Sequence, residues 1–226
     1  MNIDKQEVLR YLGYMNQSIE KELERLIDEC IAETKQYAKA KSVVKVFELE
    51  KHQHHIGLLK SKLIFRGKDI IQHLKNAKVC AIMAVTLGND IESKIRFYEK
   101  TNLTKAIILD ACATTAVECF CDEVEEEVNK EAHKRKLGIT HRYSPGYGDF
   151  SIDIQTSILN TLETQKKIGL TCTEEQILIP RKSVTAVIGF QDKDFMKKRL
   201  SCKSCSRYGD CIYKREGNDC GNKRYA

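Results

Sequence analysis

The chain has 226 residues, 42% hydrophobic and 31% charged, which is typical of a globular protein large enough to form its own core. With 2 prolines and 12 glycines it is neither fibrous nor of low complexity. The net charge of +6 is mixed along almost the whole sequence, which disfavours a nucleic-acid-binding surface. No apolar stretch approaches the ~20 residues of a membrane span, and the charged N-terminus does not resemble a signal peptide. We therefore expect a soluble, cytoplasmic protein without a membrane partner.

Hydrophobic periodicity predicts alternating helices and strands in the first part of the chain. In chain order these are helices over residues 5–14 and 17–40, a pair of strands over 43–49 and 56–65, and a helix over 68–76. The continuous apolar run over 79–87 then predicts a buried strand.

Helices predominate in the rest of the chain, with predicted ranges of 89–99, 103–134 and 151–166, before a last strand over 183–190. The helix over 103–134 carries an acidic run at 122–127 with basic residues after it, an order that suits the helix dipole and a solvated face. No internal repeat is visible. The fold class is α/β or α+β, and the strand order does not follow from the sequence.

Ten cysteines are the unusual feature of the composition. In a cytosolic protein they are not expected to form disulfides. Six lie in apolar or helical surroundings, where cysteine acts as a small buried hydrophobe: Cys30, Cys80, Cys112, Cys119, Cys121 and Cys172. The other four crowd into the C-terminal tail and require a separate explanation.

The segment His-Arg-Tyr-Ser-Pro-Gly-Tyr-Gly-Asp-Phe over 141–150 separates two predicted helices. Pro145 and Gly146 are turn signals, and a plain loop would explain them. A loop alone does not explain Arg142 and two tyrosines: the arginine fork matches a carboxylate, and a tyrosine face attracts cations. This composition suits a ligand with a carboxylate and a nearby positive centre, and at this point both interpretations stay open.

Several motifs in a fixed order carry a resemblance to a known family. Arg-Tyr-Ser-Pro-Gly-Tyr over 142–147 precedes Ile-Gly-Leu-Thr-Cys-Thr-Glu over 168–174 and Pro-Arg-Lys-Ser-Val-Thr-Ala-Val over 180–187. This order resembles the activation domain of vitamin B12-dependent methionine synthase, whose hallmark is an Arg-x-x-Pro-Gly-Tyr segment. Upstream, residues 105–118 resemble the family's helix that ends near a glutamate. The resemblance covers roughly 5–190 and implies helices around a twisted antiparallel or mixed sheet.

The resemblance also implies a function. The family's domain binds S-adenosylmethionine and presents its methyl group to cobalamin that has lapsed to the inactive Co(II) state. A flavodoxin-like or other donor supplies one electron. Such a reaction needs positioning rather than a side-chain acid or base, so we expect no catalytic residue and no independent turnover.

Motif positions imply the ligand-binding residues. Arg142 would grip the S-adenosylmethionine carboxylate. Glu118 matches the family's helical glutamate and would bind polar groups of the ligand, although a solvated helix charge is an equally good interpretation. The other implied cofactor-binding positions are Ser144 and Gly146, through backbone contacts, with Pro145 between them, and Tyr147, lining the pocket.

The chain departs from the full-length synthase. It shows no homocysteine, folate or cobalamin module, so we expect an activation subunit that works in trans on a methionine synthase lacking this domain. The family's acidic residue near the N-terminus has no clear match in residues 11–14. The cobalamin would be carried by the partner.

The last residues form a Cys-rich tail, and we divide the chain into an activation-domain-like part over 1–195 and a tail over 196–226. Four clustered thiols are enough for a zinc site or a 4Fe–4S cluster: Cys202, Cys205, Cys211 and Cys220. A metal-free tail is the third alternative. His52, His54 and His55 also resemble a metal cluster, but they lack matched partners and are interpreted as solvated.

Two other functions stay open at the level of sequence. One is a reductive activator of a different corrinoid methyltransferase, which would use the same chemistry. The other is a zinc-tailed module that binds nucleic acid through the basic tail over 193–215; it predicts salt-dependent binding and indifference to S-adenosylmethionine.

Overall fold

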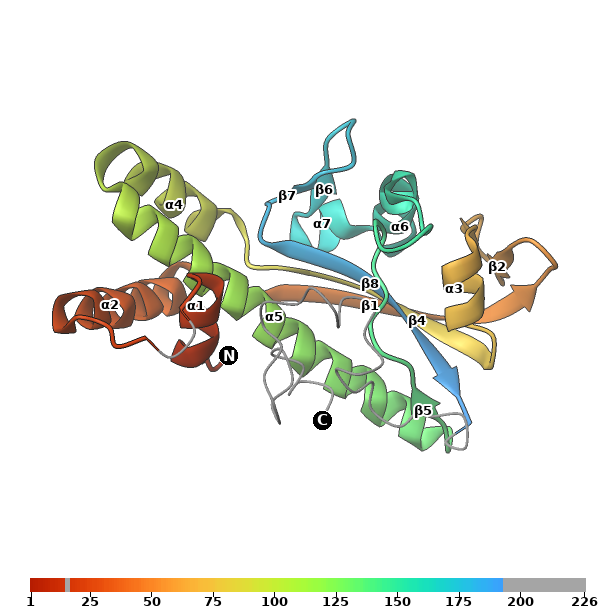
Figure 1. Ribbon diagram of the computed structural model, residues 1–226. Coiled ribbons are helices and arrows are strands. Elements are labelled where there is room, and N and C mark those ends of the chain that lie inside the picture. The colour runs from red at the N-terminus through yellow and green to blue at the C-terminus, as the bar shows by residue number, and fades with distance from the viewer. Residues whose placement is uncertain (15–16, 193–226) are drawn as a thin grey trace.

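The computed structural model of the chain describes residues 1–14 and 17–192. The predicted tail over 196–226, with Cys202, Cys205, Cys211 and Cys220, lies outside the described residues. Within the described part, helices pack on both faces of a central antiparallel sheet (Figure 1).

The sheet has six strands in the order β3-β2-β1-β4-β8-β5, and every pairing is antiparallel. Its members are β1 (Lys41–Lys51), β2 (Ile56–Leu58), β3 (Ile64–Phe65), β4 (Ala77–Thr86), β5 (Gly138–Ile139) and β8 (Ser183–Gln191). A separate hairpin pairs β6 (Thr171–Cys172) with β7 (Leu178–Ile179). The long strands β1, β4 and β8 form the centre, and the short β5 lies at the edge beside β8.

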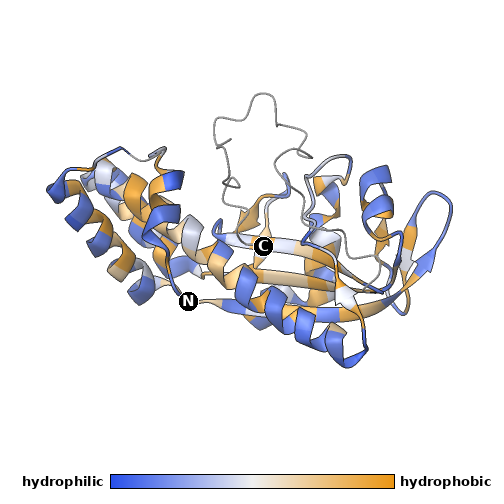
Figure 2. Ribbon diagram, turned by 60° about the horizontal axis from the view of Figure 1, so that its bottom comes forward, coloured by the Kyte–Doolittle hydropathy of each residue, from blue (hydrophilic) through white to orange (hydrophobic). Residues whose placement is uncertain are grey.

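Alternation along the central strands produces two hydrophobic cores, because successive side chains of a strand point to opposite faces. On β4, Met83 belongs to one core and Ile82 to the other. Helices α1 (Lys5–Tyr11), α2 (Lys21–Tyr37), α4 (Asn89–Thr101) and α5 (Leu103–Lys134) cover the first face. The second face is covered by α3 (Lys68–His73), η1 (Ile152–Ile154), α6 (Gln155–Leu162) and α7 (Thr164–Ile168). Figure 2 shows apolar central strands between helices with hydrophilic outer faces.

The long helix α5 is fixed at both ends. Asn102 caps its start by accepting a hydrogen bond of 3.0 Å from the backbone N of Lys105. At its end Lys136 takes the left-handed conformation, with φ 61°. The backbone N of Leu137 then donates back to the carbonyl of Ala132 at 3.0 Å, which closes the last turn as a Schellman motif.

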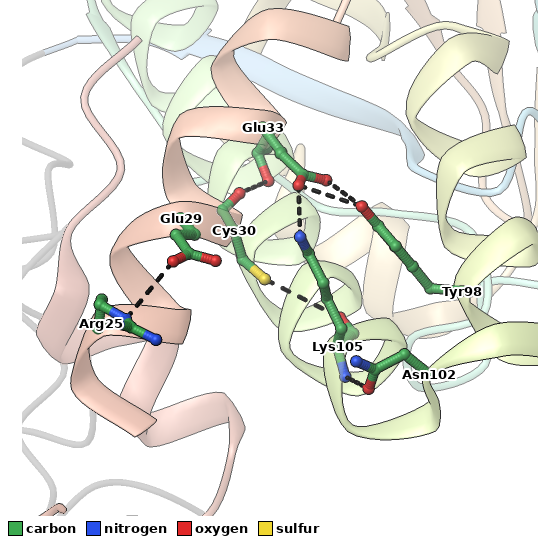
Figure 3. A network of polar contacts seen from close by, with 8 residues as sticks. Arg25, Glu29, Cys30, Glu33, Tyr98, Asn102 and Lys105 are labelled. Atoms are coloured by element: carbon green, nitrogen blue, oxygen red, sulfur yellow. Dashed lines mark hydrogen bonds and ion pairs between the residues drawn. The ribbon is translucent and has the colours of Figure 1, made fainter. Parts of the chain in front are cut away.

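Near its start, α5 is joined to α2 and α4 by an ion-pair network that we call the Glu33 cluster, formed by Glu33, Tyr98 and Lys105. The Lys105 ammonium donates to Glu33, and the Tyr98 hydroxyl lies 3.1 Å from each carboxylate oxygen of Glu33. Figure 3 shows Lys105 and Tyr98 converging on Glu33. The hydrogen bond that Lys105 donates to Glu33 is the largest cause of the raised pKa of Lys105.

The structure confirms most of the predicted elements and corrects two. The predicted strand over 56–65 is a hairpin of β2 and β3. The predicted helix over 151–166 consists of η1, α6 and α7, and the break between α6 and α7 occurs because Glu163 adopts the left-handed conformation with φ 60° and ψ 40°. Lys45 and Lys167 each lie 3.0 Å from the Glu163 carboxylate, so contacts with a strand and with the next helix favour this break.

The prediction of buried cysteines is confirmed for four of the six that the structure describes. Cys30, Cys80, Cys112 and Cys121 are buried, and Cys119 and Cys172 are half-buried. Burial raises the pKa of Cys80, Cys112 and Cys121 to about 12, so these thiols are neutral. Over the same residues, no helix combines the length and apolar character needed to cross a bilayer.

Candidate functional site

The Arg-Tyr-Ser-Pro-Gly-Tyr segment lies at the edge of the sheet, beside β8. Thr140 donates from its backbone N to the carbonyl of Gly189 at 2.9 Å. Tyr143 and Val187 then exchange backbone hydrogen bonds of 3.0 and 2.9 Å. This extended stretch sends successive side chains to opposite sides. Arg142 therefore contacts α5 on one side of the sheet, whereas Tyr143 contacts α3 on the other.

On the α5 side, Arg142 is surrounded by three carboxylates; we call these four residues the Arg142 cluster. Its Nη2 lies 2.8 Å from Asp122 and 3.4 Å from Glu118, and its Nη1 lies 3.0 Å from Glu125. The Arg142 side chain is only 7% exposed. Glu118, Asp122 and Glu125 share one face of α5 because their spacing follows the helical repeat.

The Arg142 cluster has more negative than positive charge when all its carboxylates are ionised. Burial raises the pKa of Glu125 and is the largest cause, while the attraction of Arg142 lowers it. The cluster thus places a cation next to an excess of anions at the point where the motif segment leaves the sheet edge.

On the α3 side, the motif segment is held by aromatic packing. The Tyr143 ring stacks on His73 at a centroid distance of 4.9 Å and on Phe150 at 6.1 Å. The Tyr143 hydroxyl donates to the carbonyl of Tyr147 at 3.3 Å. The Tyr147 ring is 65% exposed, so it is available to a ligand or a partner surface.

The turn after the motif is locked to the start of α3. The Asp149 carboxylate accepts hydrogen bonds from the backbone N of Lys68 at 2.6 Å and of Asp69 at 2.9 Å, and the Asp149 backbone N donates to Asp69 at 3.2 Å. Gly148 has φ 54°, and a Cβ there would lie 2.0 Å from the Asp69 carboxylate. Glycine is therefore required at this position.

Gly146 lies in a different environment. It has φ 92°, and the nearest atom to a Cβ built there is Ile152 Cδ1 at 4.0 Å. Its backbone N donates to the carbonyl of Phe150 at 2.8 Å. Gly146 thus keeps the turn closed while its Cα faces a sparsely filled space.

The second motif, Pro-Arg-Lys-Ser-Val, reaches the same face of α5. Lys182 lies 2.8 Å from Asp110 and donates to the Thr114 hydroxyl at 2.8 Å. The backbone N of Arg181 donates to the buried carboxylate of Glu92 at 2.7 Å. Both motifs are therefore fastened to α5, and the second is also fastened to α4.

The structure brings together only part of the predicted site. Arg142 and Glu118 are in contact, while Ser144, Pro145, Gly146 and Tyr147 lie in the turn that follows Arg142 along the chain. Asp122 and Glu125 were not predicted, because the acidic run was interpreted as a solvated, dipole-related feature. The i, i+4, i+7 spacing of 118, 122 and 125 was the signal that could have identified them.

The predicted match between the order of charges and the helix dipole holds only at the C-terminal end of α5. His133 and Lys134 occupy the last turn, but the first turn has no acidic residue. Among the residues that the structure describes, no group of histidine, cysteine or carboxylate side chains has the geometry of a metal site. His52 and His54 are exposed and His55 is half-buried.

Comparison with known proteins places this architecture in a class and then in a family. Its fold is similar to the "Crystal Structure of the MetH Reactivation Domain bound to AdoHcy", with a TM-score of 0.66 and 17% sequence identity over 88% of this chain and 77% of that chain. The family model "Vitamin B12 dependent methionine synthase, activation domain" matches residues 28–196. The chain therefore belongs to this family, which confirms the predicted resemblance and fold class. No curated protein matches the sequence significantly.

Proposed function

We propose that this chain binds S-adenosylmethionine and supports the reductive methylation of cobalamin carried by a partner protein. The observation that carries the proposal is the Arg142 cluster at the sheet edge, where a guanidinium and carboxylates lie side by side. An α-amino acid carries the same two charges and can pair with both. The similar MetH reactivation domain is bound to AdoHcy, the product that S-adenosylmethionine becomes after losing its methyl group.

The distances suggest how the amino-acid end is held. The contact between Arg142 and Glu118 is the longest in the cluster, at 3.4 Å. Opening it lets the ligand carboxylate pair with Arg142 and the ligand ammonium pair with Glu118, so each of the two charges exchanges one partner for another. The remaining carboxylates leave an excess of negative charge, which favours a positively charged sulfonium.

The turn supplies the rest of the proposed pocket. Because the Gly146 backbone N is bonded within the turn, its contact with the ligand would come from its carbonyl. Ser144 and Pro145 are half-buried beside it, and the exposed Tyr147 ring offers a flat surface for the adenosyl group.

The proposed reaction requires this chain only to orient the ligand. Cobalamin, when bound on the partner, supplies the reduced metal that accepts the methyl group. The residues of this chain hold the ligand by its charged end and leave the sulfonium methyl pointing outward; no side chain has to transfer a proton. The partner is proposed to be a cobalamin-dependent methionine synthase served in trans, with a flavodoxin-like or other electron donor, in the cytoplasm.

Binding is tested by calorimetric titration with S-adenosylmethionine. Arg142→Ala should weaken binding by about 1.5–3 kcal/mol, because it removes a charge-assisted contact. Arg142→Lys keeps the charge but loses the fork, and should be intermediate. Arg25→Ala is the matched control, since Arg25 also pairs with a helix carboxylate but is exposed on α2.

The functional half is tested with a corrinoid protein in its Co(II) state, a reduced flavodoxin and S-adenosylmethionine, followed by the visible spectrum of methylcobalamin. Formation of methylcobalamin only when wild-type chain is added supports the proposal. Activity with a different corrinoid methyltransferase but not with methionine synthase would redirect the assignment to that partner. If S-adenosylmethionine does not bind with or without the corrinoid protein, while salt-dependent binding to nucleic acid is seen, the proposal is wrong.

A further inference from the structure

The two ends of the Arg142 guanidinium have different surroundings. Nη1 lies 3.0 Å from Glu125, whose side chain is 16% exposed. Nη2 faces Asp122 and Glu118, whose side chains are 36% and 33% exposed. One end of the guanidinium is therefore paired with a largely buried carboxylate, and the other end with two partly exposed carboxylates.

Glu125, the partner of Nη1, is a carboxylate largely removed from water. A carboxylate that is removed from water is destabilised unless it is paired. Glu125 lies on α5 between the buried residues Val124 and Val128, and its own side chain is only 16% exposed. Binding of a carboxylate ligand to Arg142 does not by itself require this second, buried anion.

We propose that Glu125 is a positioning residue that holds Nη1 of Arg142 so that Nη2 is presented to the ligand carboxylate. This inference rests on the proposed binding of S-adenosylmethionine. A fixed guanidinium forms hydrogen bonds with less loss of side-chain freedom than a mobile one, so positioning should strengthen binding. If Glu125 instead only competed with the ligand for Arg142, its removal would make binding tighter.

The two alternatives predict opposite effects of removing Glu125 on the affinity for S-adenosylmethionine, and a pair of ligands can separate them. S-Adenosylmethionine and its decarboxylated analogue differ by the group that should contact Arg142. Calorimetric titrations of both ligands are carried out on the wild-type chain and on Glu125→Gln. Glu126→Gln is the matched control, because it makes the same change at the next residue of α5, where the side chain is exposed and bonds to Asn129.

Glu125→Gln is expected to weaken binding of S-adenosylmethionine by about tenfold, the size of one charge-assisted contact, and to change binding of the decarboxylated analogue by less than about threefold. Glu126→Gln is expected to leave both unchanged. If Glu125→Gln does not fold, as judged by its circular dichroism, Glu125→Asp takes its place; it keeps the charge but shortens the reach, and should show the same selective loss.

Three results would overturn the inference. Equal weakening of both ligands would mean that Glu125 serves only the packing of α5. Unchanged or tighter binding of S-adenosylmethionine would mean that Arg142 needs no positioning by Glu125. Failure of the wild-type chain to bind either ligand would refute the proposed function first, and the inference with it, so the two failures are distinguishable.

Discussion

Helix α5 carries two ion clusters of opposite composition. In the Glu33 cluster, near its start, one carboxylate meets one ammonium and one hydroxyl. In the Arg142 cluster, farther along the helix, one guanidinium meets three carboxylates. The first set satisfies its charges internally, whereas the second contains more anions than it can neutralise.

This difference separates a structural contact from the proposed binding site. Lys105 and Glu33 are both largely buried, and Tyr98 satisfies the remaining acceptor capacity of Glu33, so the pair fastens α2 and α4 to α5. The Arg142 cluster keeps partly exposed carboxylates whose charge a cationic ligand would offset. Three substitutions in the clusters test this distinction, and two at the ends of α5 serve for comparison; the five are taken in order of decreasing effect.

Arg142→Ala should lower the free energy of unfolding by about 3 kcal/mol, because it leaves a buried carboxylate without its cation. The pKa of Glu125 is already raised from its ordinary value of 4.5, so the folded state holds this proton more tightly and stability falls as pH rises above 4.5. Without Arg142, which lowers the pKa of Glu125, this pKa rises further and the loss of stability with rising pH becomes larger. Urea unfolding at pH 5 and pH 8 should show the larger deficit at pH 8; an equal deficit would contradict the proposed burial cost.

Glu33→Ala should lower the free energy of unfolding by about 2 kcal/mol, through loss of the pair with Lys105 and of the Tyr98 hydrogen bond. The raised pKa of Lys105 gives stability that is present below its ordinary value of 10.5 and is lost only as pH rises above it. The deficit should therefore be the same at pH 6 and pH 9 in urea unfolding. Affinity for S-adenosylmethionine should not change, and a large change would remove the distinction between the clusters.

Asn102→Ala should lower the unfolding free energy by about 1 kcal/mol, because it removes the side-chain acceptor for the backbone N of Lys105. Lys136→Gly is the counterpart at the other end of α5, where the left-handed conformation favours glycine, and should raise stability by about 0.5–1 kcal/mol. Thermal unfolding of both variants would show whether the ends of α5 respond independently of the clusters. A gain from both substitutions would contradict the observed cap.

Asp122→Asn should change the unfolding free energy by less than about 0.5 kcal/mol, since Arg142 keeps Glu125 and Glu118 and Asp122 is partly exposed. The comparison is with Glu33→Ala, where removing one carboxylate leaves the cation unpaired. Chemical unfolding of both variants in one buffer gives the difference directly. If Asp122→Asn cost as much as Glu33→Ala, the excess of anions in the Arg142 cluster would be structural after all.

The sequence predicted elements where local pattern decides the structure. The predicted helix over 103–134 has the same bounds as α5, and the apolar run over 79–87 overlaps β4 (Ala77–Thr86) almost completely. The break at Glu163 was not predicted, because Lys45, distant in sequence, helps to hold the left-handed turn. Hydrophobic periodicity likewise could not predict the strand order or the two-residue strand β5, because tertiary contacts determine which strands pair.

For the site, the resemblance named Arg142 and Glu118 as ligand-binding positions, but it predicted neither their contact with each other nor the charge balance around them. Asp122 and Glu125 belong to an acidic run that also contains exposed carboxylates such as Glu126. Which members of the run face Arg142 depends on how α5 lies against the edge of β8. That packing angle is a property of the assembled fold and is not visible in the composition of the helix.

The hydrogen bonds between Asp149 and the start of α3 have a consequence for the kinetics of the proposed ligand binding. With Gly148 closely packed on Asp69 and both carboxylates bonded to backbone N atoms, the turn from Ser144 to Phe150 is ordered before any ligand arrives. In the proposed binding mode, association then requires no loop closure, and the rearrangement that it needs is the opening of the ion pair between Arg142 and Glu118.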